Sequence, residues 1–262
     1  MMINKIFHLH VLTSVLLITG SMISCGSLNP TKQNTVPVDH LAFDDLLKKY
    51  VDEKGNVDYM GFKKDRKLFD EYLLKLKRNP PNNEHWSKNE QLAYWINAYN
   101  AFTIQLIIEN YPLETIKDIG SKIQVPFINT PWDIKFINIG GESYDLNNIE
   151  HNILRKNFNE PRIHFAIVCA SFSCPKLRSE AYKAEILDQQ LSDQAKLFLE
   201  DQTKNQIAQN QIKISKIFSW FKGDFTEKGT HIDFLNLYSS IKIDSKAKIS
   251  HMDYDWSLNE QN

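Results

Sequence analysis

Hydrophobic residues recur at helical spacing along the first half of the chain, and this pattern predicts three helices. Residues 40–51 and 64–79 each place their apolar side chains near one helical face. The most apolar stretch, residues 87–112, begins with Ser87 and Glu90 in the spacing of a capping box. Apolar residues fill most of its circumference, so we expect this helix to lie in the middle of the domain.

Two asparagines, Asn97 and Asn100, lie inside this apolar helix. A buried amide without partners costs on the order of 1–3 kcal/mol, so each must find hydrogen bonds. Two roles are open to them: a clamp on the backbone of a neighbouring loop, which we favour, or the orienting group of a catalytic site.

Shorter segments alternate in the second half of the chain. Residues 132–146 predict a β-hairpin, because apolar positions roughly alternate and Gly140-Gly141 supplies a tight turn. Asp145 or Asn147 is expected to cap the helix that follows. The remaining predicted elements are a helix over 146–158, a buried strand over 162–168, a helix over 182–200, a short strand over 212–214 and a helix over 232–240. Helices around a small, largely antiparallel sheet make an α+β domain, with one buried central helix.

The N-terminus resembles a secretory signal. Residues 1–24 combine Lys5 with an apolar core at 11–18 that is too short to span a bilayer. Cys25 follows this core, as in bacterial lipoproteins, where the signal is removed before the cysteine and the sulfur carries the lipid. Residues 22–24, Met-Ile-Ser, depart from the usual lipoprotein box. An ordinary signal peptide with an incidental cysteine is the alternative.

Lipidation at Cys25 divides the chain into three parts. After the signal, residues 25–38 are polar and interrupted by Pro, and they predict a flexible, lipid-anchored tether. Residues 39–262 then form a single domain. Gly26 favours the outer membrane, with the domain facing the periplasm. The membrane is thus the expected partner, reached through the lipid anchor.

The charge balance argues against a nucleic-acid partner. The chain has 31 Lys and Arg against 32 Asp and Glu, and no basic block stands out. A peptide or a cell-wall fragment is the ligand class that remains open, and no oligomeric state is implied.

Two cysteines, Cys169 and Cys174, are left in the domain, with His164 before them and Pro175 after them. A cysteine at the end of a strand, before a helix that Pro175 begins, is where thiol nucleophiles are often held. We therefore consider Cys174 as a nucleophile and His151 as its general base. Glu150 or Asn97 would orient the base, as in papain-like and transglutaminase-like sites.

Other interpretations of the cysteines compete with this one. An oxidising compartment favours a Cys169–Cys174 disulfide, which removes the nucleophile. The pair is alternatively two inert thiols, or a redox pair, although its four-residue gap differs from the two-residue gap of thioredoxins. His151 and His164 with a cysteine match no common zinc spacing, so neither a metal nor another cofactor is predicted.

The region also contains candidates for a substrate groove. Trp132 and Trp220 lie in predicted loops, where partly exposed indoles line a groove for a peptide or a sugar. Arg155 pairs with Glu150 or binds a substrate carboxylate, and the ion pair is favoured. We expect His164 to be a buried core histidine. The alternative is that it lines the substrate groove.

Five segments carry a resemblance to a known family. They read AYWINAYNAFTI, YPLETIKDI, LNNIEHNILR, RIHFAIVCASFSCPKL and YDWSLN. In this order they resemble the family catalogued as domain of unknown function 547, from about Val57 to Asn259. The resemblance implies the fold and the domain limits, and it implies no reaction.

Two hypotheses follow for the function. The first is an envelope lipoprotein with a cysteine-dependent hydrolase or acyl transferase site. The second is a non-catalytic envelope domain that binds a partner or serves a structural role, with Cys169 and Cys174 bridged. Whether the protein is an enzyme stays open at this point.

Overall fold

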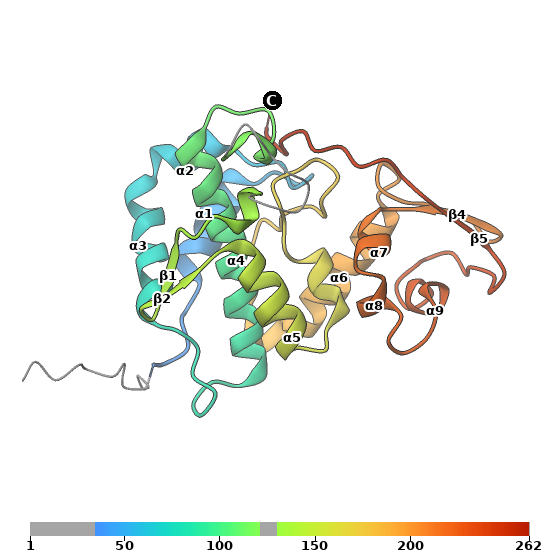
Figure 1. Ribbon diagram of the computed structural model, residues 1–262, viewed down its shortest axis with the longest axis horizontal. Helices are drawn as coiled ribbons and strands as arrows, with labels where there is room; N and C mark the ends of the chain where they lie inside the picture. Colours follow the sequence, from blue (N-terminus) through green and yellow to red (C-terminus); the bar gives the residue numbers. More distant parts are fainter. Residues whose placement is uncertain (1–34, 121–129, 262) are drawn as a thin grey trace, which may run out of the picture. The chain divides into compact units, whose positions relative to one another are not determined.

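Helix α4 (Lys88–Asn110) runs through the middle of the fold, as its sequence predicts (Figure 1). The Ser87 hydroxyl accepts from the Glu90 N–H at 3.2 Å, and the Glu90 carboxylate accepts from the Ser87 N–H at 2.6 Å, which closes the predicted capping box. Its side chains are buried from residue 91 to residue 108. The structure is a computed structural model that describes residues 35–120 and 130–261, so the predicted signal, Cys25 and most of the tether lie outside the described residues.

Three helices from the N-terminal part of the domain pack together. They are α1 (Leu41–Tyr50), α2 (Tyr59–Lys64) and α3 (Arg66–Arg78). Helices α2 and α3 contact α4, and α1 contacts α2 and α3. Aromatic rings join them, as in the stack of Phe43 on Tyr72 with centroids 4.9 Å apart. The helices predicted over 40–51 and 64–79 are confirmed. Within the described ranges, no helix has the length and apolar character needed to cross a membrane.

The predicted hairpin is also confirmed. Strands β1 (Ile137–Ile139) and β2 (Glu142–Tyr144) pair antiparallel, with the turn at Gly140 and Gly141. Both glycines have positive φ, +62° and +88°, which residues with a Cβ rarely adopt. Two short 3₁₀ turns precede the hairpin, η1 (Ile116–Asp118) and η2 (Pro131–Asp133).

The helix predicted over 146–158 has an unusual form. Asp145 accepts from the N–H of Asn148 at 2.6 Å and begins it, as expected for a cap. The chain then forms a π-helix, η3 (Asn148–Leu154), before the short α5 (Arg155–Asn157). Wide π turns are rare and occur often at functional sites. This one carries both Glu150 and His151.

The strand predicted over 162–168 is wrong. Pro161–Phe165 forms the 3₁₀ helix η4, and irregular backbone follows it. The reason lies in Asn100, whose side chain donates to the carbonyl of Ala166 and accepts from the N–H of Val168, both at 2.9 Å. A buried amide thus supplies the hydrogen bonds that a neighbouring strand would have supplied.

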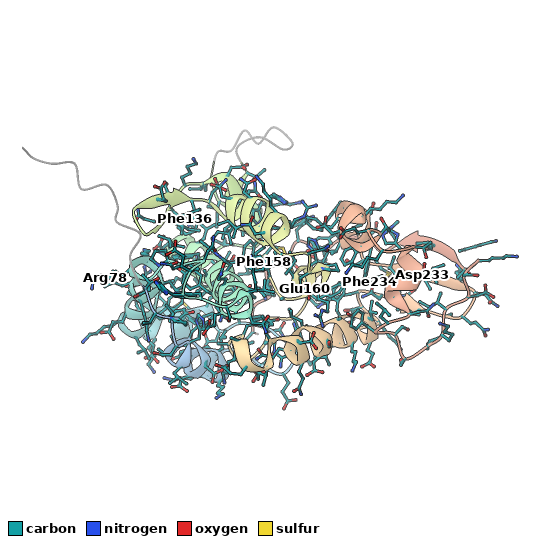
Figure 2. All side chains as sticks on the ribbon, turned by 90° about the horizontal axis from the view of Figure 1, so that it is seen from below. Arg78, Phe136, Phe158, Glu160, Asp233 and Phe234 are labelled. Carbon is teal, nitrogen blue, oxygen red and sulfur yellow. A yellow bond between two sulfur atoms is a disulfide. The ribbon has the colours of Figure 1, made fainter. Side chains whose placement is uncertain are left out.

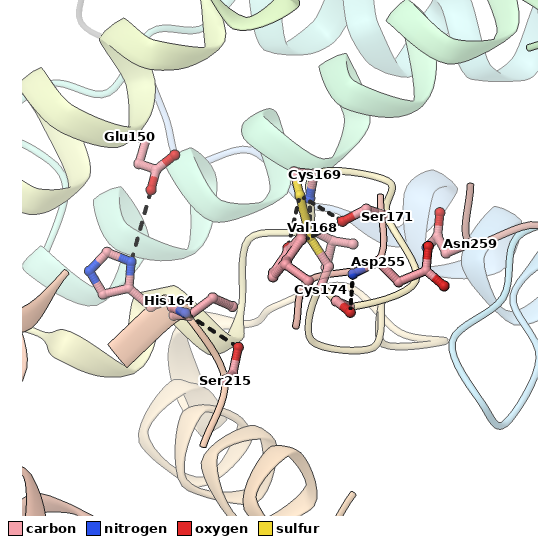
Figure 3. The surroundings of a disulfide bond; sticks show 12 residues. Glu150, His164, Val168, Cys169, Ser171, Cys174, Ser215, Asp255 and Asn259 are labelled. Atoms are coloured by element: carbon pink, nitrogen blue, oxygen red, sulfur yellow. Dashed lines mark hydrogen bonds and ion pairs between the residues drawn. A yellow bond between two sulfur atoms is a disulfide. The ribbon is translucent and has the colours of Figure 1, made fainter. Parts of the chain in front are cut away.

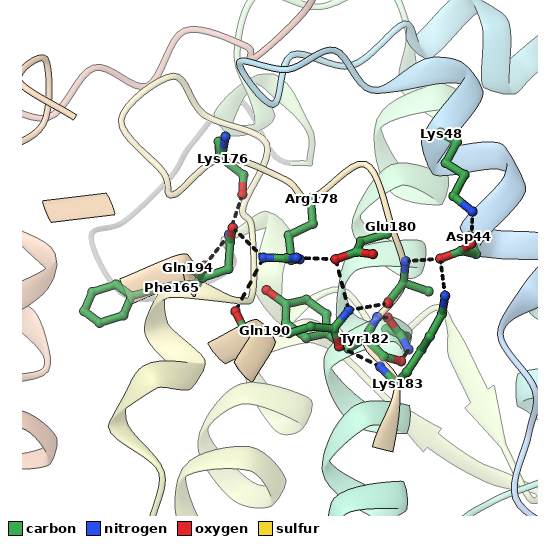
Figure 4. Close-up of polar contacts among 12 residues, drawn as sticks. Asp44, Lys48, Phe165, Lys176, Arg178, Glu180, Tyr182, Lys183, Gln190 and Gln194 are labelled. Carbon is green, nitrogen blue, oxygen red and sulfur yellow. Dashed lines mark hydrogen bonds and ion pairs between the residues drawn. The ribbon is translucent and has the colours of Figure 1, made fainter. Parts of the chain in front are cut away.

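The helix expected to begin at Pro175 is absent as well. The chain stays irregular, with a bend at residues 179–180, until η5 (Ala184–Ile186) and α6 (Leu187–Glu200). Side chains hold this segment in place of a helix (Figure 4). Gln194 donates to the carbonyl of Lys176 at 2.9 Å, Gln190 donates to the carbonyl of Ala181 at 2.9 Å, and Asp44 accepts from the N–H of Ala181 at 2.9 Å.

A second small sheet lies in the C-terminal part. Its strands are β3 (Gln206–Ile207), β4 (Gln211–Ile214) and β5 (Lys248–His251). β3 pairs antiparallel with β4, whereas β4 and β5 are parallel. The described residues thus form two small sheets, and the α+β class is confirmed.

Short helices and a phenylalanine cluster accompany this sheet. The helices are α7 (Ile217–Trp220), α8 (Lys222–Phe225) and α9 (His231–Leu235), the last shorter than the helix predicted over 232–240. Phe165, Phe218, Phe225 and Phe234 pack together, with Phe218 and Phe225 centroids 4.7 Å apart. In Figure 2 the label of Phe234 stands beside that of Glu160, toward the orange C-terminal part of the chain. This cluster fixes α8 against η4.

The last residues of the chain return to the cysteine loop. The N–H of Phe172 donates to the carbonyl of Ser257 at 2.7 Å, and the N–H of Asn259 donates to the carbonyl of Ala170 at 3.2 Å. The extended C-terminal segment therefore clamps the loop between the two cysteines.

Candidate functional site

Cys169 and Cys174 are joined by a disulfide at the end of the irregular segment that follows η4 (Figure 3). Their Cα atoms are 6.4 Å apart. Cys169 is partly exposed, whereas Cys174 is buried. Between them, Ala170 has a φ of +60°, a conformation that residues other than glycine seldom adopt outside functional loops.

Three donors converge on the sulfur of Cys174. The N–H of Cys169 lies 3.1 Å from it, the hydroxyl of Tyr254 lies 3.3 Å away and the hydroxyl of Ser171 lies 3.4 Å away. Tyr254 comes from the C-terminal segment that clamps the loop. Donors around a sulfur stabilise its thiolate form once the disulfide is reduced.

The disulfide lines a cavity of about 200 Å³. The same cavity is lined by seven candidate site residues of the sequence: Trp132, Glu150, His151, His164, Cys169, Cys174 and Trp220. Residues from four separate parts of the chain therefore meet here. Pockets that hold drug-sized ligands measure about 300–1,000 Å³, so this one suits a smaller group.

Glu150 is the most unusual acid of the site. Burial raises the pKa of its carboxyl to about 7, while Arg155 opposes the effect and Asp224 adds to it. Its nearest basic partner is Nδ1 of His164, and Oε1 lies 3.9 Å from that atom, beyond a hydrogen bond (Figure 3). At neutral pH this carboxyl both accepts and donates protons.

His164 is held by a carboxylate. Its Nε2 lies 2.7 Å from Oδ2 of Asp224, and its ring stacks on Phe221 at 3.9 Å between centroids. Because burial lowers its pKa, the imidazole is neutral at pH 7. A neutral ring that donates through Nε2 leaves Nδ1 free to accept a proton on the side of Glu150.

Asp224, on α8, completes this arrangement. Arg155 binds both of its oxygens, through Nε at 2.6 Å and Nη2 at 2.8 Å. Burial alone would raise the pKa of Asp224, but the hydrogen bonds from Arg155 and His164 outweigh it and hold this pKa well below its usual range. The predicted pairing of Arg155 with Glu150 is thus replaced by a bidentate pair with Asp224.

His151 lines the cavity and is exposed to solvent. The guanidinium of Arg155 donates to its Nδ1 at 3.0 Å, so the remaining proton is on Nε2. Packing beside Phe221 and the charge of Arg155 lower the pKa of His151. In the described part of the chain, no hydrogen bond joins His151 to Glu150 or to Cys174. The three predicted catalytic residues share a cavity without forming a connected triad.

Asn97 is placed outside the lining of the cavity. Its Nδ2 donates to the carbonyl of Tyr182 at 2.8 Å, and its Oδ1 accepts from the N–H of the same residue at 2.9 Å. Both halves of the amide are therefore committed to one backbone unit. This is the clamp that the sequence favoured, and the amide is not directed at either histidine.

Aromatic rings form one wall of the cavity. Trp256 contacts Trp132, Trp220 and Tyr254, with centroids 5.7, 5.8 and 4.5 Å away. Trp220 and Tyr254 also contact each other, with centroids 4.7 Å apart, and all four rings line the cavity. Trp220 is 48% exposed, so the wall extends to the surface. Nζ of Lys117 lies 3.6 Å from the centroid of Trp256, a cation–π contact.

Sequence reasoning missed three residues of the site. Asp224 is 60 positions from His164 along the chain, in a segment without a motif. Tyr254 and Trp256 belong to the YDWSLN segment, which was singled out only for the family resemblance. Among the described residues, no group of three His, Cys, Asp or Glu is arranged to hold a metal ion.

Comparisons with known proteins give a single match. Residues 83–199 match the model of the family described as "Protein of unknown function, DUF547". No curated protein and no solved structure matches the chain. The match supports the resemblance to this domain family across α4, the π-helix, the cysteine loop and α6, and it ends before Asp224.

Proposed function

We propose that the cavity carries out thiol–disulfide exchange, with the Cys169–Cys174 pair as its reacting group. The supporting observation is the asymmetry of the two sulfurs. Cys169 is partly exposed, whereas Cys174 is buried and its sulfur accepts from the N–H of Cys169 at 3.1 Å. The hydroxyls of Ser171 and Tyr254 lie 3.3–3.5 Å from both sulfurs, so they support whichever sulfur becomes the thiolate. Exchange needs one accessible sulfur to be attacked and one stabilised thiolate to leave, and this pair offers both.

The proposed reaction is balanced by substrate thiols alone. A substrate thiolate attacks Sγ of Cys169, the Sγ–Sγ bond breaks, and its electron pair goes to Cys174 as a thiolate. A second substrate thiolate then attacks the mixed disulfide and releases Cys169. Two substrate thiols become one substrate disulfide, and the protein pair gains two electrons and two protons.

Single-serine variants of the full-length protein test this proposal. Cys174→Ser leaves the accessible thiol, and we expect it to form a mixed disulfide with oxidised glutathione, measured by mass spectrometry of the peptide that carries both positions. Cys169→Ser leaves the buried thiol and should react at least about tenfold more slowly. Equal rates in the two variants, or a wild-type bridge that native protein keeps in excess dithiothreitol, would exclude exchange.

A second candidate is the cysteine-dependent hydrolase or acyl transferase expected from the sequence. One observation favours it: His164 donates to Asp224 through one nitrogen and has the other free, as a general base requires. In this version reduced Cys174 is the nucleophile, and His164 takes the role that was expected of His151. In the described structure no hydrogen bond joins His164 to either sulfur, so the loop has to move.

The two candidates differ in their need for Cys169. Acyl transfer needs one sulfur, so Cys169→Ser should be labelled at Cys174 by an activated ester such as p-nitrophenyl acetate, and His164→Ala should stop the labelling. Exchange needs both sulfurs. If neither reagent reacts with the native protein, the non-catalytic binding or structural hypothesis is retained. The disulfide then only holds the loop in place.

We also propose that the domain is anchored to the outer membrane by a lipid on Cys25 and faces the periplasm. The signal-like pattern of residues 1–24 and the position of Cys25 support this. Cells that express the protein and grow with an alkyne-tagged fatty acid should label the wild type, and Cys25→Ser should abolish the label. Labelling that survives this substitution would exclude the anchor.

A further inference from the structure

Within residues 35–120 and 130–261, no group donates a hydrogen bond to the carboxylate of Glu150. The residue is 9% exposed, and in the described structure the nearest basic atom is Nδ1 of His164 at 3.9 Å. Buried carboxylates are normally hydrogen bonded or paired with a cation. Because Glu150 also lines the cavity, the missing partner can enter from the solvent side.

The ionisable groups around Glu150 are paired with one another or neutral, so one added cation would balance the charge of its carboxylate. Arg155 is bound by both oxygens of Asp224, so these two charges compensate each other. His164 and His151 are neutral at pH 7, because each has a lowered pKa. Tyr99 and Tyr254 face the same carboxyl and stay neutral, since burial raises the pKa of both. An ionised Glu150 therefore carries the one uncompensated charge of this group.

The opposite wall consists of aromatic faces. Trp132, Trp220 and Trp256 with Tyr254 line the cavity, and indole faces attract cations more strongly than other rings do. One of these faces already has a cation within the protein, the ammonium of Lys117 on Trp256. Aromatic faces on one side and a carboxylate on the other are the two elements of an organic cation site.

We infer that the cavity binds an organic ammonium head group, with the aromatic wall around it and Glu150 as its counter-charge. The volume of about 200 Å³ suits a head group with a short chain. The inference gives the proposed site a ligand class, and it rests on Glu150 and the aromatic rings rather than on the sulfurs. A methylated and a primary ammonium share this chemistry.

Choline and its neutral isostere 3,3-dimethyl-1-butanol test the inference on the full-length protein. Calorimetry measures both affinities, and the fluorescence of the cavity tryptophans gives a second readout. We expect choline to bind at least about tenfold more tightly at pH 8, because only the cation gains from Glu150. Between pH 8 and pH 6 the choline affinity should fall by about tenfold, as the ionised fraction of Glu150 falls.

Two variants separate the carboxylate from general effects. Glu150→Gln keeps the shape and leaves the aromatic wall intact, so it should lower the choline affinity at pH 8 by about tenfold and remove the pH dependence, while choline keeps the cation–π part of its preference over the isostere. Glu142→Gln changes an exposed glutamate on β2 and should alter neither. If Glu150→Gln fails to fold, Trp256→Phe replaces it as the test and should weaken choline binding. Ethanolamine then shows whether a primary ammonium binds as well as the methylated one.

Three results would overturn the inference: equal affinities for choline and its isostere, absence of saturable choline binding to the wild type, or full choline affinity in folded Glu150→Gln. The titrations are repeated after reduction with dithiothreitol and in the Cys169→Ser, Cys174→Ser double variant. Choline binding that persists in this double variant, which has no sulfur in the loop, shows that the ligand site is independent of the sulfurs. Failure of exchange is then measured separately, by the single-serine variants and by dithiothreitol on the wild type.

Discussion

The carboxyl of Glu150 lies 3.9 Å from Nδ1 of His164, close enough for an electrostatic interaction and too far for a hydrogen bond. Neither group is compensated by the other at neutral pH, because the imidazole is neutral and burial raises the pKa of the carboxyl to about 7. This relationship makes an ionised Glu150 a destabilising residue above about pH 7.

The first prediction concerns the pH dependence of stability. The pKa of Glu150 is about 7 in the folded protein, against 4.5 for a glutamate in the unfolded chain. The contribution of this carboxyl to stability is therefore fully present below pH 4.5 and is lost as the pH rises through 7. This difference corresponds to roughly 3 kcal/mol. Glu150→Gln should therefore be more stable than the wild type at pH 8, measured as the free energy of urea unfolding, and the gain should vanish near pH 4.

A flat comparison would contradict this prediction. If the wild type and Glu150→Gln differ by the same free energy at pH 4 and at pH 8, the carboxyl titrates normally in the folded protein. Glu142→Gln serves as the control, since its exposed carboxyl makes no comparable contribution at either pH.

The second prediction concerns Asp224. Asp224→Asn keeps the shape but removes the charge that Arg155 and His164 share, so we expect a loss of about 1–3 kcal/mol in the free energy of unfolding. Because the folded pKa of Asp224 lies below its usual 3.8, the stability it provides is present above that pH and is lost as the pH falls below it. The difference between variant and wild type should therefore shrink in acid.

A second aspartate–arginine pair provides the matched control. Asp188 lies 2.8 Å from Arg162, but its side chain is 85% exposed. Asp188→Asn should change stability by no more than about 0.5 kcal/mol, because exposed ion pairs contribute little. If both substitutions have the same small effect, Asp224 is not held as the structure indicates.

The third prediction concerns the clamp on Tyr182. Asn97→Ala leaves a buried N–H and a buried carbonyl of Tyr182 without partners, so the expected loss is about 2–4 kcal/mol in chemical denaturation. Asn89→Ala, on the exposed face of the same helix, should change stability by less than about 0.5 kcal/mol. A loss of activity in Asn97→Ala without a loss of stability would instead give the amide a catalytic role.

Local patterns predicted much of the fold. Three features were predicted in this way: the capping box of Ser87 and Glu90, the apolar circumference of α4 and the Gly140-Gly141 turn. Each depends on residues that are close together in the sequence. Such features follow from hydrogen bonds and backbone conformations that neighbouring residues decide. For this reason the central helix and the hairpin agree with the prediction.

The segment around the cysteines could not be predicted in the same way. Residues 162–168 are as apolar as a buried strand, but Asn100, more than 60 positions earlier, takes the hydrogen bonds of their backbone. The cavity itself was found only in part. Glu150, His151, His164 and the cysteines are near in sequence, whereas Asp224 and Tyr254 arrive by tertiary packing that no local pattern encodes.

The last prediction concerns the hydroxyl of Tyr254, which lies 3.3 Å from the sulfur of Cys174. In a Cys169→Ser background, which has one thiol in the loop, Tyr254→Phe removes one of the donors that stabilise the thiolate. The pKa of Cys174 should rise by roughly 0.5–1, measured from the pH dependence of its alkylation rate. Ser171→Ala should raise it less, because that hydroxyl is farther away at 3.4 Å. Tyr238→Phe, outside the cavity, is the control, and an unchanged pKa in Tyr254→Phe would mean that the hydroxyl does not support a leaving thiolate.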